Sequence, residues 1–160
     1  MIEAYFDGCM EPVNPGGTGA YGVVILKDDQ EIFRDSKIFK PVSGREKENS
    51  NNCAEYSGFE AILLFLLKEG FNKEEIIVRG DSRLVICQNW IACGYRKKWN
   101  IQGGYYEGIA LRCRKLLKKF PKIKGEWIPR EQNYIADELS KEELRKAGII
   151  FRIQPEREAL

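Results

Sequence analysis

The order of the apolar runs along the chain is the feature that most narrows its possible folds. Three β-rich runs, at residues 3–6, 20–26 and 32–39, follow one another through short connections, which predicts an antiparallel meander. From residue 51 the apolar side chains recur at helical spacing, and helices then alternate with two further strands. The later elements are expected at residues 51–69, 75–79, 82–91, 109–120, 122–128 and 133–146.

This order, βββαβααβα, predicts an α/β fold on a mixed five-stranded sheet, in which three antiparallel strands precede parallel strands reached through helices. Helices are expected on both faces of the sheet. A chain of 160 residues suits one domain, assigned here to residues 1–148, and Gly148 ends its last helix. Residues 149–160 are assigned to a C-terminal tail of unknown role.

Composition excludes several functional classes. The chain is 43% hydrophobic and 31% charged, as in soluble globular proteins, and its longest strongly apolar stretch, residues 61–67, is too short to span a membrane. The chain has no histidine, so Ser-His-Asp and Cys-His catalysis and imidazole metal sites are excluded. Five cysteines without a CxxC pair are expected to be buried thiols. The start of the chain, MIEAYFDG, has neither the basic nor the apolar segment of a signal peptide, so a cytoplasmic location is expected.

Basic residues are concentrated in one part of the chain. The formal net charge is only +2, but residues 96–124 hold ten Lys or Arg and one acid. Aromatic residues lie within and beside this segment, at Tyr95, Trp99, Tyr105 and Tyr106. Such a segment is typical of a surface that contacts a phosphate backbone, although a solvated helix face would have the same composition.

Four carboxylates occupy informative positions. Asp7 follows the first strand, and Glu55 lies one turn into the first helix on the same face as Asn51 and Asn52. Asp81 ends the fourth strand, and Asp137 lies in the first turns of the last helix. Each has an ordinary structural explanation, namely turn formation before Gly8, the helix dipole for Glu55 and Asp137, and helix capping for Asp81.

Together these acids indicate a metal site. Carboxylates that converge repel one another and need cations, and oxygen ligands without histidine or thiolate favour Mg²⁺ or Mn²⁺. Two such ions can activate water and stabilise the leaving oxygen in an attack on phosphate. The basic segment would bind the polyanion that carries this phosphate.

Five motifs in this order resemble type 1 ribonuclease H over about residues 1–147. The match is closest to a shorter branch without histidine, whose last motif reads PREQN followed by AD. The motifs are Asp7-Gly8, Asn14-Pro15-Gly16-Gly17, SNNCAE at residues 50–55, GDS at residues 80–82, and WIPREQNYIADELS at residues 127–140.

The resemblance implies endonucleolytic hydrolysis of the RNA strand of an RNA–DNA hybrid, which leaves 5′-phosphate and 3′-hydroxyl ends. It implies that Asp7, Glu55, Asp81 and Asp137 are catalytic acids that hold two Mg²⁺ or Mn²⁺ ions. The enzyme is expected to act as a monomer without a membrane partner. The residues expected to contact or position the substrate are Gly8, Asn14, Asn51, Asn52, Ser82, Lys118, Lys119, Arg130 and Asn133.

Two departures from the family pattern keep other functions open. The loop histidine of the family is missing, and Arg130 and Glu131 occupy that region instead, so either turnover is slow or one of these residues substitutes for the histidine. The segment after Asp81 is also short for the family's basic handle, so the basic helix around Lys118 and Lys119 is the other candidate for phosphate contact. The alternatives are a nucleic-acid-binding module with little or no catalysis, and a nuclease that also cuts double-stranded RNA or RNA–DNA junctions.

Overall fold

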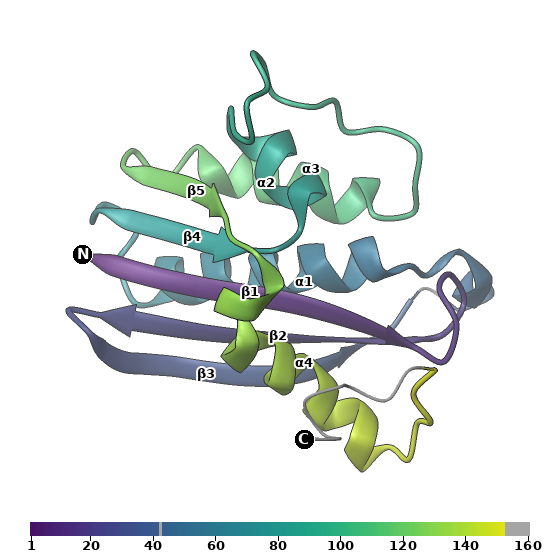
Figure 1. The fold of residues 1–160 in the computed structure, drawn as a ribbon. Helices are drawn as coiled ribbons and strands as arrows, with labels where there is room; N and C mark the ends of the chain where they lie inside the picture. The colour runs from purple at the N-terminus through teal and green to yellow at the C-terminus, as the bar shows by residue number, and fades with distance from the viewer. Residues whose placement is uncertain (42, 153–160) are drawn as a thin grey trace.

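A computed structural model describes residues 1–41 and 43–152 of the chain (Figure 1). Its central feature is one five-stranded sheet with the strand order β3-β2-β1-β4-β5. The elements are β1 (Ile2–Glu11), β2 (Thr18–Lys27), β3 (Gln30–Phe39), α1 (Asn51–Lys68), β4 (Ile76–Gly80), α2 (Arg83–Asn89), α3 (Glu107–Leu117), β5 (Ile123–Trp127) and α4 (Tyr134–Lys146), with short 3₁₀ turns at Glu46–Glu48 and Arg130–Gln132.

The sheet is mixed, as the sequence predicts. β1 lies at its centre and pairs antiparallel with β2, which pairs antiparallel with β3. On its other side β1 pairs parallel with β4, and β4 pairs parallel with β5. The fold class, an α/β sheet with three antiparallel strands followed by parallel ones, is therefore confirmed.

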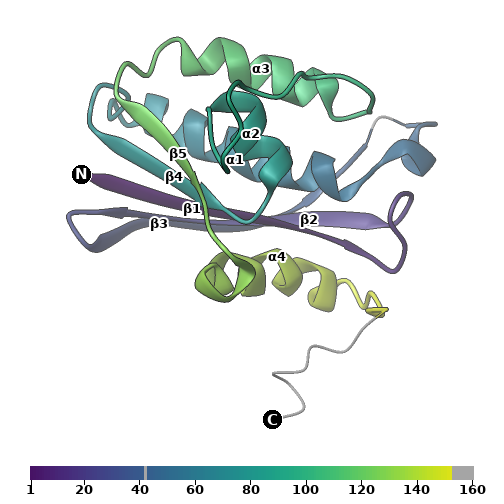
Figure 2. The ribbon, with the colours of Figure 1, turned by 45° about the horizontal axis from the view of Figure 1, so that its top comes forward.

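Helices cover both faces of the sheet. α1, α2 and α3 lie on one face and α4 lies alone on the other (Figure 2). The core between α1 and the sheet contains Phe59, Ile62 and Leu66 from the helix, packed among apolar strand residues. On the opposite face α4 approaches β2 at Gly22, where a Cβ atom would lie only 2.5 Å from the Leu139 Cβ atom. Only glycine allows α4 to lie so close to the sheet.

The prediction that the first strand ends at residue 6 is wrong. β1 continues to Glu11 because it pairs with β2 along its whole length, including Asp7 with Gly22. Its pairing with β4 stops earlier, at Tyr5 with Arg79. Asp7 is therefore a strand residue rather than a turn residue, and it lies where β1 and β4 separate.

A long connection, residues 90–106, joins α2 to α3 and projects beyond the helices (Figure 1). A buried network holds its base. Gln88 Nε2 donates to the Asn100 carbonyl and to the Tyr106 hydroxyl, each over 2.9 Å. The Tyr56 hydroxyl of α1 donates to Gln88 Oε1 over 2.6 Å. The projecting segment is thus tied to the core through α1 and α2.

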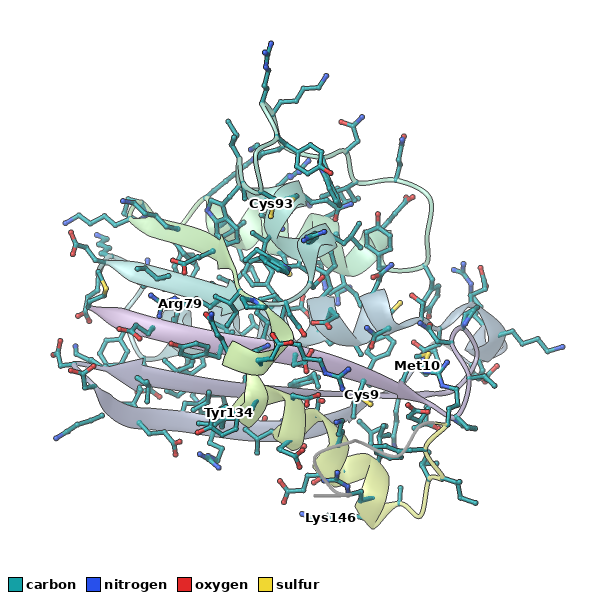
Figure 3. All side chains as sticks on the ribbon, viewed as in Figure 1. Cys9, Met10, Arg79, Cys93, Tyr134 and Lys146 are labelled. Atoms are coloured by element: carbon teal, nitrogen blue, oxygen red, sulfur yellow. The ribbon has the colours of Figure 1, made fainter. Side chains whose placement is uncertain are left out.

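The thiols and the described part of the tail complete the fold. All five cysteines are free. Cys53, Cys87 and Cys113 are buried as expected, but the expectation is wrong for Cys93, which is exposed beyond α2, and for Cys9 on β1, which is only partly buried (Figure 3). Arg152 reaches back to β1, where its Nε donates to Glu11 Oε2 over 3.0 Å. The rest of the predicted tail, residues 153–160, lies outside the described residues. Among the described helices none is long and apolar enough to cross a membrane.

Candidate active site

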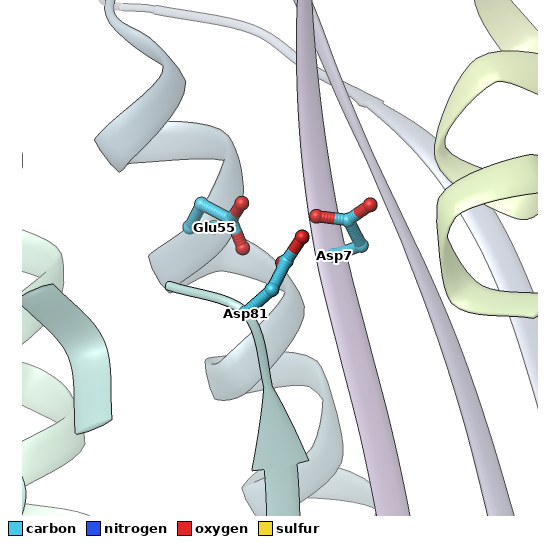
Figure 4. A group of neighbouring side chains, drawn as sticks. All are labelled: Asp7, Glu55 and Asp81. Atoms are coloured by element: carbon cyan, nitrogen blue, oxygen red, sulfur yellow. The ribbon is translucent and has the colours of Figure 1, made fainter. Parts of the chain in front are cut away.

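Three of the four predicted acids come together beside the centre of the sheet. Asp7 comes from β1, Glu55 from the first turns of α1, and Asp81 directly follows β4. Each offers a carboxylate oxygen, and these three atoms lie within 4.8 Å of one another. Figure 4 shows the three carboxylates directed toward a common point. We call this group the carboxylate triad.

Glycine at position 8 allows α1 to deliver Glu55 to the triad. A Cβ atom at Gly8 would lie 2.6 Å from the Glu55 backbone nitrogen and 2.9 Å from the Ala54 carbonyl carbon. These distances are shorter than any real Cβ contact, so a larger residue would push α1 away from β1. The Gly8 N–H also donates to Asp7 Oδ1 over 2.9 Å, which orients that carboxylate.

Local hydrogen bonds leave the Asp81 side chain available for the triad. The N-cap of α2 is Ser82, whose Oγ accepts from the Val85 N–H over 3.2 Å. The capping role that the sequence also allows for Asp81 is therefore taken by its neighbour. Trp127 Nε1 donates to the Asp81 carbonyl over 3.1 Å and fixes the backbone there.

The electrostatics of the triad favour a bound cation. Asp7 and Glu55 are each only 4% exposed. Burial, followed by repulsion from Glu55, holds the pKa of Asp7 well above its usual range, and burial and repulsion from Asp81 raise the pKa of Glu55 to about 8. Among the described residues, Glu55 Oε2 and Asp81 Oδ1 are shielded from solvent and lack a hydrogen-bond partner. Hard oxygen ligands with unsatisfied lone pairs fit Mg²⁺ or Mn²⁺.

Asp137, the fourth acid, occupies the same cleft but is held by two cations. It is 3% exposed, and its Oδ2 atom lies 3.3 Å from Lys141 Nζ. Its Oδ1 atom lies 3.7 Å from a terminal nitrogen of Arg130. The structure thus brings three acids together and places the fourth on α4, among the residues that line the cleft.

The cleft that contains the acids has a volume of about 1030 Å³. Several predicted substrate-binding residues line it, while Asn133 is buried and donates from Nδ2 to the Phe6 carbonyl over 2.9 Å. Asn14 Oδ1 accepts from the Asn51 N–H over 3.1 Å and so joins the β1–β2 turn to the start of α1. The predicted substrate residues in the lining are Gly8, Asn14, Asn51, Asn52, Ser82 and Arg130.

Two predicted substrate residues lie elsewhere. Lys118 and Lys119 follow α3 near the amino ends of β4 and β5, whereas the triad lies beyond the carboxyl end of β4. The Lys119 carbonyl accepts from Asn72 Nδ2 over 2.8 Å, which fixes this end of the helix.

The sequence analysis missed several residues of the cleft. Lys141 stands four residues after Asp137, and this helical spacing between opposite charges was a usable signal. Arg152 lines the cleft through its contacts with β1, and no local pattern indicates a contact between residues so distant in sequence. The other cleft residues that were not predicted are Cys9, Met10, Glu11, Arg83, Leu84 and Phe151.

The fold and the triad together define a ribonuclease H-like protein, and comparison with solved structures agrees. The ribonuclease H1 of Halobacterium salinarum is 29% identical, with a TM-score of 0.72, and the match covers 91% of this chain and 98% of that one. LC11-RNase H1, isolated from compost by a metagenomic approach, was solved in complex with an RNA/DNA hybrid. It is 26% identical, with a TM-score of 0.75 and coverage of 92% and 99%.

The sequence profile of the reverse transcriptase-like family matches residues 5–143. The chain belongs to this family, and its resemblance to type 1 ribonuclease H is confirmed. The bifunctional protein Rv2228c of Mycobacterium tuberculosis is 29% identical over 135 residues, which is 84% of this chain. The chain spans about a third of the length of that relative.

Proposed function

We propose that the protein is a metal-dependent endonuclease that hydrolyses the RNA strand of RNA–DNA hybrids to 5′-phosphate and 3′-hydroxyl ends. The observation that carries this proposal is the triad of Asp7, Glu55 and Asp81, with its mutual repulsion and its unsatisfied buried oxygens. The hybrid bound to the similar LC11-RNase H1 supports the choice of substrate.

The proposed mechanism gives each group of residues a separate task. Asp7, Glu55 and Asp81 would hold a first Mg²⁺ or Mn²⁺ ion, and Asp137 would help to hold a second. Bound ions supply an activated water and neutralise charge on the phosphate oxygens. The protein's own contribution is to fix the carboxylates on β1, on α1 and at the end of β4, and to keep bulk water from Asp7 and Glu55 by burial.

Side chains beside the acids would read the RNA strand. Asn14, Asn51 and Asn52 line the cleft, and their amide groups can donate to or accept from a 2′-hydroxyl. Arg130 stands 63% exposed at the cleft, where its guanidinium can contact a phosphate. The three asparagines offer a way to distinguish RNA from DNA through the 2′-hydroxyl.

Two basic regions are proposed to hold the nucleic acid outside the cleft. Arg96, Lys97 and Lys98 are exposed on the projecting 90–106 connection, beside Tyr95 and Trp99, whose rings meet edge to face at 5.1 Å. Lys118 and Lys119 are the second proposed phosphate contact. The cytoplasmic location and the monomeric state stay predictions.

The test is cleavage of an end-labelled RNA–DNA hybrid in Mg²⁺, Mn²⁺ or EDTA. We expect metal-dependent cutting of the RNA strand by the wild type and a loss of at least about a thousandfold in Asp81→Asn, because a metal ligand is removed. Asp29→Asn is the matched control, since this acid is exposed in the β2–β3 turn and should leave cutting unchanged. Retained cutting by Asp81→Asn would contradict the metal assignment.

The same assay decides between the alternative functions. Double-stranded RNA, double-stranded DNA and an RNA–DNA junction are tested beside the hybrid. Cutting of double-stranded RNA or of the junction would establish the broader nuclease. Tight hybrid binding without cutting in either metal would establish the nucleic-acid-binding module.

A further inference from the structure

The fourth acid differs from the triad in its electrostatic partners. Lys141 lies one turn after Asp137 on α4, and both side chains are only 4% exposed. The 3.3 Å separation of Nζ and Oδ2 makes this a buried ion pair. Arg130 approaches the other carboxylate oxygen from the exposed side of the cleft. Asp137 is therefore already neutralised by cations of the protein.

The triad has no such partners. In the part of the chain that the structure describes, no lysine or arginine forms an ion pair with Asp7, Glu55 or Asp81. One side of the cleft therefore carries carboxylates without a basic partner. The side formed by α4 carries the positive charge of Lys141. A first divalent cation is attracted to the triad, whereas a second ion near Asp137 would meet the Lys141 ammonium.

We infer that Lys141 is a positioning residue. When nucleic acid is absent, its ammonium pairs with the Asp137 carboxylate and takes the place of the second metal ion. This inference rests on the proposed function. Without substrate the cleft takes one divalent ion at the triad. The second ion binds to Asp137 only when Lys141 moves away.

The chemistry of lysine suits such an exchange. Its ammonium is a compact charge on a flexible stem, so it can move to another anion without the fixed bidentate geometry of arginine. A phosphate of the nucleic acid that enters the cleft is such an anion. Transfer of Lys141 from Asp137 to that phosphate would expose the carboxylate to the second ion at the moment when the substrate is in place.

The experiment measures binding of Mn²⁺ alone to the full chain, without nucleic acid, by titration calorimetry and by the electron paramagnetic resonance signal of free Mn²⁺. The wild type should bind one ion with clear preference. Lys141→Met keeps the apolar stem but removes the charge, and it should bind a second ion about tenfold more tightly than the wild type does.

Three further variants show whether the effect acts through Asp137. Lys141→Arg keeps the charge and should behave as the wild type. Asp137→Asn should retain the first ion, and Asp137→Asn combined with Lys141→Met should lose the gain of the single Lys141 variant. Circular dichroism and thermal unfolding check that each variant is folded.

The outcomes separate this inference from the proposed function. If Lys141→Met binds Mn²⁺ with the same number and affinity as the wild type, or if the double variant keeps the gain, the inference is overturned. Two ions of equal affinity in the wild type would also overturn it. If the wild type binds no ion, or if Asp81→Asn binds as the wild type does, the metal site of the proposed function fails instead.

Discussion

Asn133 donates from Nδ2 to the carbonyl of Phe6 over 2.9 Å, and this bond joins α4 to β1 one residue before Asp7. The Asn133 carbonyl in turn accepts from the Asp137 N–H over 3.0 Å, in the first turn of the helix. One amide therefore sets the position of the fourth acid relative to the first. The two acids lie 130 positions apart in sequence, but they are attached to the same point of the sheet.

Asn133→Ala should destabilise the protein because it leaves the buried Phe6 carbonyl without its partner. The expected loss in the free energy of unfolding is about 1–3 kcal/mol, measured by urea denaturation. Asn72→Ala is the matched control, since Asn72 also donates to a carbonyl but at an exposed position. Its loss should stay below about 0.5 kcal/mol. Equal losses in the two variants would show that the Asn133 bond has no special role.

The metal-free protein should become less stable as the pH rises. The pKa of Glu55 increases on folding from its ordinary value of 4.5 to about 8, and burial also raises the pKa of Asp7. The folded state then binds more protons than the unfolded state between these values, so stability decreases with pH across that window. Thermal unfolding in EDTA at about pH 5, 6.5 and 8 would measure this decrease, because these values span the window.

Two comparisons identify the triad as the cause of this pH dependence. Asp7→Asn removes one of the repelling charges and should unfold at a higher temperature than the wild type at the alkaline end of the series in EDTA. Mg²⁺ should restore the stability of the wild type there, because it binds the folded state. A transition temperature independent of pH in EDTA would count against strong repulsion in the triad.

Gly8→Ala should damage both the fold and the site. The added Cβ atom would lie 2.6 Å from the Glu55 nitrogen, so α1 must move away from β1. We expect a loss of about 1–3 kcal/mol in stability, together with weaker Mn²⁺ binding. Gly108→Ala is the control, because nothing lies within 4 Å of its Cβ position in α3. That change should be neutral or stabilise the protein by up to about 1 kcal/mol.

The salt dependence of hybrid binding tests the two basic regions. Replacing Lys118 and Lys119 with alanine should weaken binding and reduce the slope of log K against log salt by up to about 2, if both contact phosphates. Replacing Lys97 and Lys98 is the matched comparison, since it removes the same charge from the projecting connection. A pair whose removal leaves the slope unchanged belongs to a solvated surface.

Local patterns predict the elements, whereas pairing partners determine where they end. The helical spacing from Asn51 predicts the start of α1, and the structure confirms it. The extent of β1 to Glu11 depends on β2, which no local pattern in β1 itself reveals. Within the candidate site, the motifs predict all four acids. They do not predict that three acids converge in the triad while Asp137 pairs with Lys141 and Arg130. The contact between Arg152 and Glu11 joins residues distant in sequence and was not predictable.

The attachment of Asp137 to α4 has a consequence for protein synthesis. The triad comes from the first 81 residues, but α4 follows every strand of the sheet. A nascent chain on the ribosome could therefore assemble the triad while the fourth carboxylate is still inside the exit tunnel. If Asp137 holds the second ion as proposed, nuclease activity would begin only after α4 has emerged and docked at Gly22, and an incomplete translation product would lack it.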